Sequence, residues 1–193
     1  MSQPKDYVNF LLAALTKPFK VGAIAPSSRA LAEAMLVDMK PDEVSGLIEI
    51  GPGTGAMTRV ILEKLKDRSQ YLGIDINARF VEKLTTHYPG ARFVHDSAEN
   101  LGELLKPGEK VDYIVCSLPW AIWPTKVQKQ ILNKLIAPLR KGGKFKSFAY
   151  IQTMHTPAAA RFRELLQDSF SSFETSSIVW RNLPPAVVYH CIK

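Results

Sequence analysis

Residues 48–62, IEIGPGTGAMTRVIL, decide the fold of this chain. An apolar run ends at Gly51, the glycines Gly53 and Gly55 follow, and apolar residues then recur at helical spacing. Glycines at such a junction let the backbone turn sharply and let a ligand approach without a Cβ in the way. The stretch therefore predicts a strand at 44–50, a ligand-binding glycine loop and a helix at 56–66.

The same alternation of strand and helix continues toward the C-terminus. It predicts strands at 71–76, 91–96, 111–118 and 144–153, and helices at 80–88, 127–139 and 161–170. Residues 176–193, SSIVWRNLPPAVVYHCIK, predict two further strands around a Leu-Pro-Pro turn with no helix between them. We therefore expect an α/β fold with a mostly parallel seven-stranded sheet, an antiparallel C-terminal hairpin and helices on both faces.

Length and composition set wider limits. The 193 residues suit a single domain over 1–193, and 46% hydrophobic with 22% charged residues is an ordinary globular balance. The net charge of +7 favours a polyanionic partner, either nucleic acid or an anionic membrane, although a basic protein without such a partner stays open. We find no signal peptide, membrane-spanning run or disulfide framework, so we expect the cytoplasm. No histidines stand at metal-ligand spacing, so we expect no metal.

Residues 1–43 precede the first strand of the predicted sheet. Residues 6–15, DYVNFLLAAL, predict a short and very apolar helix. The loop KPFKVGAIAPSS follows, and then a helix from Arg29 to about Met39, with Ser27 or Ser28 as its N-cap.

Acidic residues end three successive predicted strands, at Glu49, Asp75 and Asp96. In an open α/β sheet, ligands bind at those carboxyl ends. Glu49 suits an α-ammonium, Asp75 a ribose diol and Asp96 an adenine amine, which together match S-adenosylmethionine. NAD is the alternative for the glycine loop alone, and Asp75 and Asp96 are alternatively helix caps. The remaining residues predicted at the cofactor are Gly51, Gly53, Thr54, Gly55, Ile76, Ser97, Ala98 and Ser117.

The turn Ser117-Leu118-Pro119-Trp120 follows the fourth predicted strand. An amine nucleophile needs acceptors for its N–H groups, and the Leu118 carbonyl and the Ser117 side chain could supply them. Pro119 makes the turn rigid, and the face of Trp120 could stabilise the ammonium that forms. The alternative is a proline-aromatic turn that only packs the core.

The motifs IEIGPGTGAMTRVIL, SLPW, GAIAPSS and NLPPAVVY together resemble those of bacterial phospholipid N-methyltransferases over nearly the whole chain. The resemblance implies a Rossmann-like class I methyltransferase fold. It also implies transfer of methyl groups from S-adenosylmethionine to phosphatidylethanolamine and its methylated intermediates, giving phosphatidylcholine, with S-adenosylhomocysteine as product. Ribosomal RNA adenine dimethyltransferases resemble the chain more loosely. They have Asn-Leu-Pro-Tyr at the turn and a further helical C-terminal domain.

The same resemblance implies roles for particular residues. The N-terminal amphipathic helix, about 4–15, would dock on an anionic membrane, which would place the protein peripherally on the inner face of the plasma membrane. The alternative is that this segment is an ordinary core helix. Loop 22–28, with Ser27 and Ser28, would lie over the cofactor. Tyr150 would join Trp120 at the amine, and the alternative is a tyrosine that only packs the core. The residues implied at the lipid substrate are Phe19 and Ile24 for acyl chains, Lys20, Arg29 or Arg181 for the phosphate, and Pro119 in the turn.

Three other functions stay open at this point, two enzymatic and one non-enzymatic. Ornithine lipids also present an amine at a membrane surface, and relatives of this family methylate them. An RNA adenine-N6 methyltransferase is compatible with the positive charge, although the apolar N-terminal segment argues against nucleic acid. A binding module without activity would be expected to have lost Glu49, Asp75 or the SLPW turn, and this chain retains them.

Overall fold

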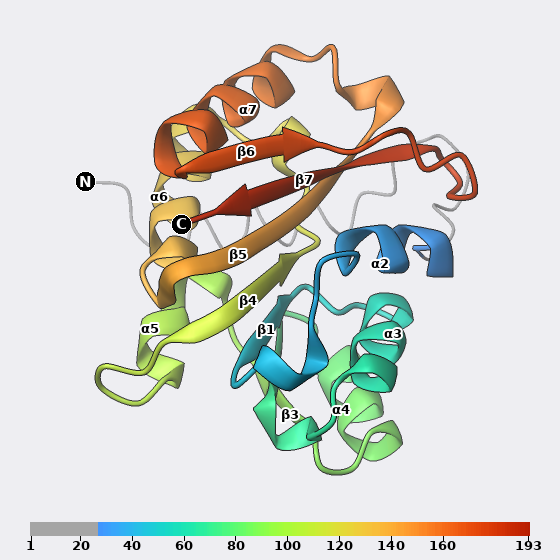
Figure 1. The fold of residues 1–193 in the computed structure, drawn as a ribbon, viewed down its shortest axis with the longest axis vertical. Coiled ribbons are helices and arrows are strands. Elements are labelled where there is room, and N and C mark those ends of the chain that lie inside the picture. Colours follow the sequence, from blue (N-terminus) through green and yellow to red (C-terminus); the bar gives the residue numbers. More distant parts are fainter. Residues whose placement is uncertain (1–26) are drawn as a thin grey trace.

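The computed structural model describes residues 27–193, which form one seven-stranded sheet with the order β3-β2-β1-β4-β5-β7-β6 (Figure 1). Neighbouring strands from β3 to β5 are parallel, and β7 runs antiparallel to both β5 and β6. The strands are β1 Leu47–Ile50, β2 Tyr71–Asp75, β3 Arg92–His95, β4 Val111–Cys116, β5 Leu139–Tyr150, β6 Ser172–Thr175 and β7 Ala186–Ile192. The helices are α2 Arg29–Met35, α3 Ala56–Lys64, α4 Ala78–His87, α5 Leu101–Leu104, α6 Thr125–Ile136 and α7 Pro157–Ser169.

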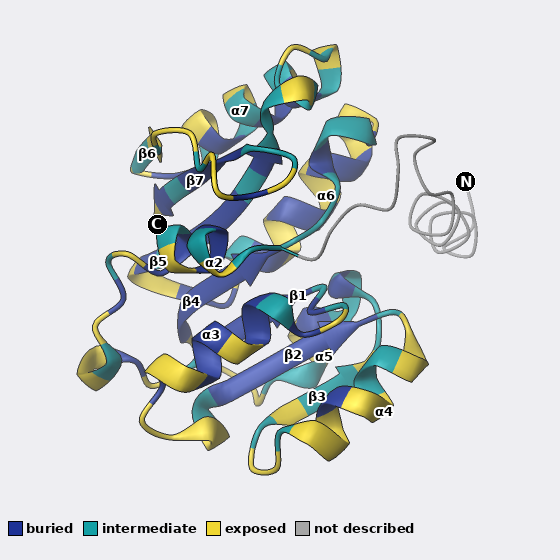
Figure 2. Cartoon of the chain, turned by 90° about the vertical axis from the view of Figure 1, so that its right-hand side faces the viewer, coloured by how far each residue is buried: buried dark blue, intermediate teal, exposed yellow. Residues whose placement is uncertain are grey.

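Helices cover both faces of the sheet, and buried strands separate them (Figure 2). Because successive side chains of a strand point to opposite faces, β1 sends Ile48 and Ile50 to one face and Leu47 and Glu49 to the other. The first face packs against α5, α6 and α7, and the second against α2 and α3. The predicted α/β fold, with its mostly parallel sheet and antiparallel C-terminal pair, is confirmed.

Two element predictions are wrong in detail, and one short helix was missed. The sixth strand is β6, before the predicted stretch 176–193, and within that stretch the Val179–Ala186 bridge lies outside the named strands. Strand β5 begins at Leu139, earlier than predicted, because Leu139 already pairs with Val111 of β4. The next pair is Tyr113–Lys144, so the register shifts between them. Helix α6 accordingly ends at Ile136. The irregular stretch between these two pairs includes Gly142 and Gly143. Helix α5 was not predicted, since four residues give too little periodicity.

Two segments far apart in the sequence meet where α2 begins. The Ser28 hydroxyl accepts a hydrogen bond from the Leu31 amide at 3.1 Å, so Ser28 is the N-cap, as predicted. The Ser28 amide donates to Oδ1 of the buried Asn182 at 2.8 Å, and Asn182 Nδ2 donates to the Pro184 carbonyl at 2.7 Å. The two terminal motifs, SS at 27–28 and NLPP at 182–185, therefore form one structural unit.

Candidate active site

A cavity of about 670 Å³ opens where the carboxyl ends of β1 to β4 meet. Its wall includes apolar side chains from the sheet, Ile50 and Ile74, and from α6, Ile131, beside the polar ends of the strands. Of the residues predicted to bind the cofactor or to act in catalysis, the cavity is lined by Gly51, Gly53, Asp75, Ile76, Asp96, Ser97, Ala98, Ser117 and Leu118. The strand ends thus bring together residues that are widely separated in the sequence.

Asp75 is buried at the cavity wall, and both of its carboxylate oxygens accept backbone hydrogen bonds. Gly53 N donates to Oδ2 at 2.9 Å and Asn77 N donates to Oδ1 at 2.8 Å. Burial raises the pKa of Asp75, and these two hydrogen bonds oppose that shift. Helix α4 is capped by Asn77, so the alternative role of Asp75 as its cap is wrong. Each carboxylate oxygen can accept a second hydrogen bond, so Asp75 can still bind a diol.

Asp96 follows β3 next to Asp75, whose carbonyl accepts a hydrogen bond from Asp96 N at 3.1 Å. Its Oδ1 accepts from Ser97 N at 2.6 Å and from Asn100 Nδ2 at 2.7 Å, which fixes the carboxylate against the next turn. The Ser97 hydroxyl, and not Asp96, caps the short 3-10 helix that follows. Asp96 therefore has acceptor capacity left for an amine on the cavity side.

Glu49 lies elsewhere than predicted. Its side chain is fully buried on the α3 face of the sheet, and it does not line the cavity. Its Oε2 accepts from Thr58 Oγ1 at 2.8 Å and from Tyr71 Oη at 2.6 Å. Among the described residues, Oε1 has no hydrogen-bond partner. Burial raises the pKa of Glu49 to about 7. Because Ile50 faces the cavity and strand side chains alternate, the Glu49 carboxylate points to the other face of β1.

The last part of the glycine loop supports packing rather than lining the cavity. Thr54 is exposed, and Gly55 starts α3 with a φ of +85°. A Cβ at Gly55 would stand 2.6 Å from Leu84 Cδ2 on α4. Gly55 is therefore required for the close approach of α3 and α4. Thr54 and Gly55, which were predicted at the cofactor, do not line the cavity.

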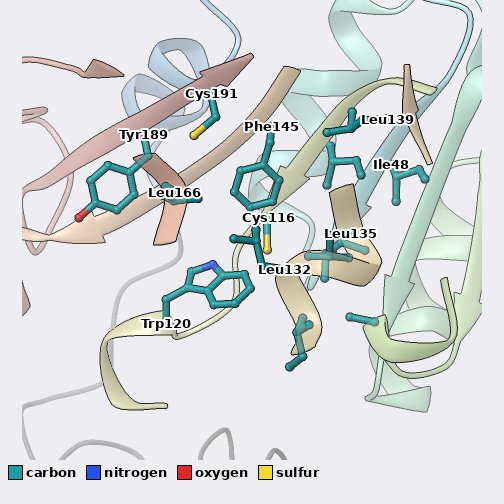
Figure 3. Packing of buried hydrophobic residues seen from close by; sticks show 14 of the residues in the cluster. Ile48, Cys116, Trp120, Leu132, Leu135, Leu139, Phe145, Leu166, Tyr189 and Cys191 are labelled. Atoms are coloured by element: carbon teal, nitrogen blue, oxygen red, sulfur yellow. The ribbon is translucent and has the colours of Figure 1, made fainter. Parts of the chain in front are cut away.

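The aromatic residues predicted at the amine lie on opposite faces of the sheet. Trp120 is only 3% exposed and stacks on Phe162 with ring centroids 4.2 Å apart, among the core side chains of Figure 3. Tyr150 is half-buried on the α2 face beside Phe148. Neither lines the cavity, and the core-packing alternative holds for Trp120. The turn after Cys116 carries the indole into the α6–α7 layer, so the described residues do not bring the predicted pair together. Pro119 precedes this ring and does not line the cavity.

Gln128, which was not predicted, holds this turn in place. It is fully buried on α6, and its Nε2 donates to the Trp120 carbonyl at 2.7 Å and to the Ala158 carbonyl at 3.0 Å. A single amide thus ties the turn after β4 to the start of α7. The signal in the sequence was a polar residue at a core position of an amphipathic helix.

Some of the residues predicted at the lipid, and in the loop over the cofactor, are described by the structure, and others are not. Arg29 is on the surface of α2, where it forms ion pairs of 2.8 Å with Glu33 and Glu63. Arg181 is exposed, and it forms no ion pair with another described residue. Neither Ser27 nor Ser28 lines the cavity. The predictions at Phe19, Lys20, Ile24, helix 4–15 and loop positions 22–26 lie outside the described residues.

Two further observations concern residues 27–193 alone. No helix in this range has the length and apolar character needed to cross a bilayer. No cluster of three or more His, Cys, Asp or Glu side chains stands there in a metal-binding arrangement.

Comparison with known proteins assigns the chain to a family. The family described as "Methyltransferase domain" matches residues 47–143, which hold the glycine loop, β1 to β4 and α6. The ornithine lipid N-methyltransferase of Singulisphaera acidiphila is 23% identical over 97% of this chain and 96% of its own length. The ribosomal RNA small subunit methyltransferase A of Dehalococcoides mccartyi is 30% identical over 52% of this chain and 34% of its own length.

Solved structures share the fold. The N-methyltransferase NodS of Bradyrhizobium japonicum, in complex with S-adenosyl-L-homocysteine, superposes with a TM-score of 0.63 at 14% identity, covering 97% of both chains. The predicted Rossmann-like methyltransferase fold is thereby confirmed.

Proposed function

The chain belongs to the methyltransferase-domain family and is an S-adenosylmethionine-dependent methyltransferase, and on that premise we propose that it methylates the amine of a membrane lipid. The single observation that carries the proposal is the extent of the alignment with the ornithine lipid N-methyltransferase, which covers almost all of both chains. The alignment with the ribosomal RNA enzyme covers about half of this chain, although its identity is higher.

The cavity fits S-adenosylmethionine by its chemistry. Asp75 offers two carboxylate oxygens for a ribose diol, and Asp96 with Ser97 offers polar partners for adenine. Ile76, Ala98 and Leu118 supply apolar surface for the base. Gly53 has a φ of +55° and no atom within 4 Å of an added Cβ, so its backbone is open to a ligand. The cofactor supplies a methyl group on a sulfonium, which an amine nitrogen can attack.

The turn after β4 is where the amine is expected to enter. Ser117 and Leu118 line the cavity. The Leu118 carbonyl accepts one hydrogen bond, from Trp120 N at 3.0 Å, and can accept a second from an N–H group of a substrate. A lipid ammonium must lose a proton before its lone pair can attack, and an apolar cavity wall lowers the pKa of such a group. Positioning and electrostatics would account for the rate, with no covalent enzyme intermediate.

Two lipid classes meet this description. Ornithine lipid is favoured by the nearly full-length relative, and phosphatidylethanolamine by the motifs of the sequence. Both carry a primary amine at the membrane surface. Substrates of this kind are consistent with a protein that works peripherally on the inner face of the plasma membrane, which we include in the proposal.

Radiolabelled S-adenosylmethionine tests the proposal. The protein is incubated with phosphatidylglycerol vesicles that contain ornithine lipid or phosphatidylethanolamine, and with ribosomal RNA in a separate tube. Asp75→Asn serves as the control for transfer that depends on the cavity. We expect label in one or both lipids, lost in the variant. Chromatography of the products counts the methyl groups added. Label in RNA alone, or in neither lipid, would overturn the lipid assignment.

A further inference from the structure

The loop between β6 and β7, residues 176–185, exposes its large apolar side chains. Trp180 is 68% exposed, Leu183 72% and Ile178 38%. Single exposed apolar residues are ordinary, but these three fall within six positions of one loop. Figure 2 shows this loop as an exposed segment beside α2.

The loop is ordered by hydrogen bonds that turn its polar side chain inward. Val179 N donates to the Ala186 carbonyl at 2.7 Å and Asn182 N donates to the Val179 carbonyl at 3.2 Å. Asn182 is 2% exposed and is bonded to Ser28 and Pro184. The amide of Asn182 therefore points into the protein while the indole of Trp180 points out. This inverts the usual preference of these side chains.

The loop lies at the edge of the sheet where the cavity opens. Ala186, at the start of β7, pairs with Tyr150 at the carboxyl end of β5, and Ile151 N donates to the Pro185 carbonyl at 3.0 Å. The cavity is formed at the carboxyl ends of β1 to β4, on the same edge. A surface bound through this loop would thus face the side from which a substrate reaches the cavity.

We propose that residues 178–183 insert into the interface of an anionic bilayer and present the cavity edge to it, an inference that rests on the proposed lipid substrate. Indole rings prefer the headgroup level of a membrane, where one side is apolar and the other wet. Arg181 stands between Trp180 and Leu183, and residues 176–185 contain no acidic residue that an anionic surface would repel. The net charge of +7 acts in the same direction.

The distribution of tryptophan makes a direct test possible. The chain has three tryptophans, and Trp120 and Trp123 are buried at 3% and 1% exposure, so Trp180 is the one exposed to solvent. The full chain is mixed with phosphatidylglycerol vesicles that carry a quencher on the upper acyl chain. We expect a blue shift and quenching of the emission. Trp180→Phe keeps an aromatic ring but removes the reporter, so it should show neither change.

A second measurement uses vesicle sedimentation with Trp180→Ser/Leu183→Ser. Loss of both side chains should weaken partitioning by about tenfold or more, because binding scales with buried apolar area. Val37→Ser is the matched control, since Val37 is 73% exposed but lies beyond the far end of α2. Unquenched Trp180, or loop and control variants that bind vesicles equally, would overturn the inference.

The same samples separate this inference from the proposed function. Lipid methylation by the wild type with no quenching of Trp180 would refute the loop contact and leave the lipid activity. Quenching of Trp180 without methylation of any lipid would support the contact and refute the activity. Circular dichroism shows whether the double variant is folded. If it is not, the inference is decided by comparing the quenching of the wild type with that of Trp180→Phe.

Discussion

At the residue scale, the carboxyl group of Glu49 is buried where water cannot stabilise its charge. Burial raises its pKa to about 7 from an ordinary value of 4.5, so the folded protein holds this proton more tightly than the unfolded chain does. The contribution to the free energy of unfolding is complete below pH 4.5 and is lost as pH rises to about 7. The loss amounts to about 3 kcal/mol.

Glu49→Gln tests this assignment because glutamine does not titrate. We expect the decline in the free energy of unfolding between pH 4.5 and 7 to be shallower in the variant than in the wild type. Urea unfolding at several pH values measures both slopes, and the comparison is independent of any constant offset from the substitution. Parallel pH profiles for the two proteins would show that Glu49 is ionised throughout.

Asp75 should decide cofactor affinity. Asp75→Asn removes the charge and replaces one acceptor oxygen by a donor, so hydrogen bonds to a diol are lost. These are worth about 1.5–3 kcal/mol when one partner is charged, or roughly 10- to 100-fold in Kd. Calorimetric titration with S-adenosylhomocysteine measures the change. Asp67→Asn alters an exposed aspartate that also accepts a hydrogen bond from a backbone amide, and it should bind normally.

Gln128 should govern the transfer step more than cofactor binding. Gln128→Leu removes the side-chain hydrogen bonds to the Trp120 and Ala158 carbonyls, and the Trp120 carbonyl keeps its bond from Trp123 N at 3.3 Å. Each lost bond should cost about 1 kcal/mol in the free energy of unfolding. We expect a lower Tm and slower methyl transfer, with S-adenosylhomocysteine bound within about twofold of wild type because Asp75 and Asp96 are unchanged. Gln130→Leu, on the exposed face of α6, is the matched control.

The sequence was sufficient to predict some of the residues that line the cavity and not others. Asp75 and Asp96 could be predicted because the end of a strand is visible in the sequence and all parallel strands end at one edge. The position of Trp120 could not, since it depends on stacking with Phe162 on a helix that comes later in the chain. For Glu49, the strand was predicted correctly but not which face its side chain would take.

At the scale of elements, α2 is held at its first turn by the C-terminal part of the chain. Asn182→Ala would leave the Ser28 amide and the Pro184 carbonyl without their partners. We expect a loss of about 1–3 kcal/mol in the free energy of unfolding, measured in urea. Asn133→Ala removes an exposed asparagine of α6 and should change stability by less than about 0.5 kcal/mol. Equal losses in the two variants would mean that the Ser28–Asn182 contact contributes little.

Element predictions succeeded where periodicity was long and failed where pairing decided the outcome. Strands β1 to β4 and helices α3, α4 and α6 were found within a few residues of their bounds. Strand β6 has four residues, two of them exposed, and is a strand because it pairs with β7. Alternation in so short an edge strand carries little signal. The stretch around Trp180, which has strand-like composition, became the exposed loop instead.

At the scale of the whole molecule, the excess positive charge should make membrane binding sensitive to salt. Partitioning of the full chain onto phosphatidylglycerol vesicles should fall as ionic strength rises from 0.05 to 0.5 M, because the Debye length shortens from about 14 Å to 4 Å over that range. Sedimentation at each salt concentration measures the change, and uncharged phosphatidylcholine vesicles are the control. Binding that stayed constant with salt would assign the attachment to apolar contacts alone.

The strand order also constrains how the protein can be made. Strand β7 follows β6 in the sequence, yet it lies between β5 and β6 in the sheet. On the ribosome, β5 therefore remains an open sheet edge, and β6 has no strand to pair with, until residues 186–192 have emerged. A nascent chain stalled before Ala186 would carry both unpaired strands, which makes it a candidate for chaperone binding and for aggregation.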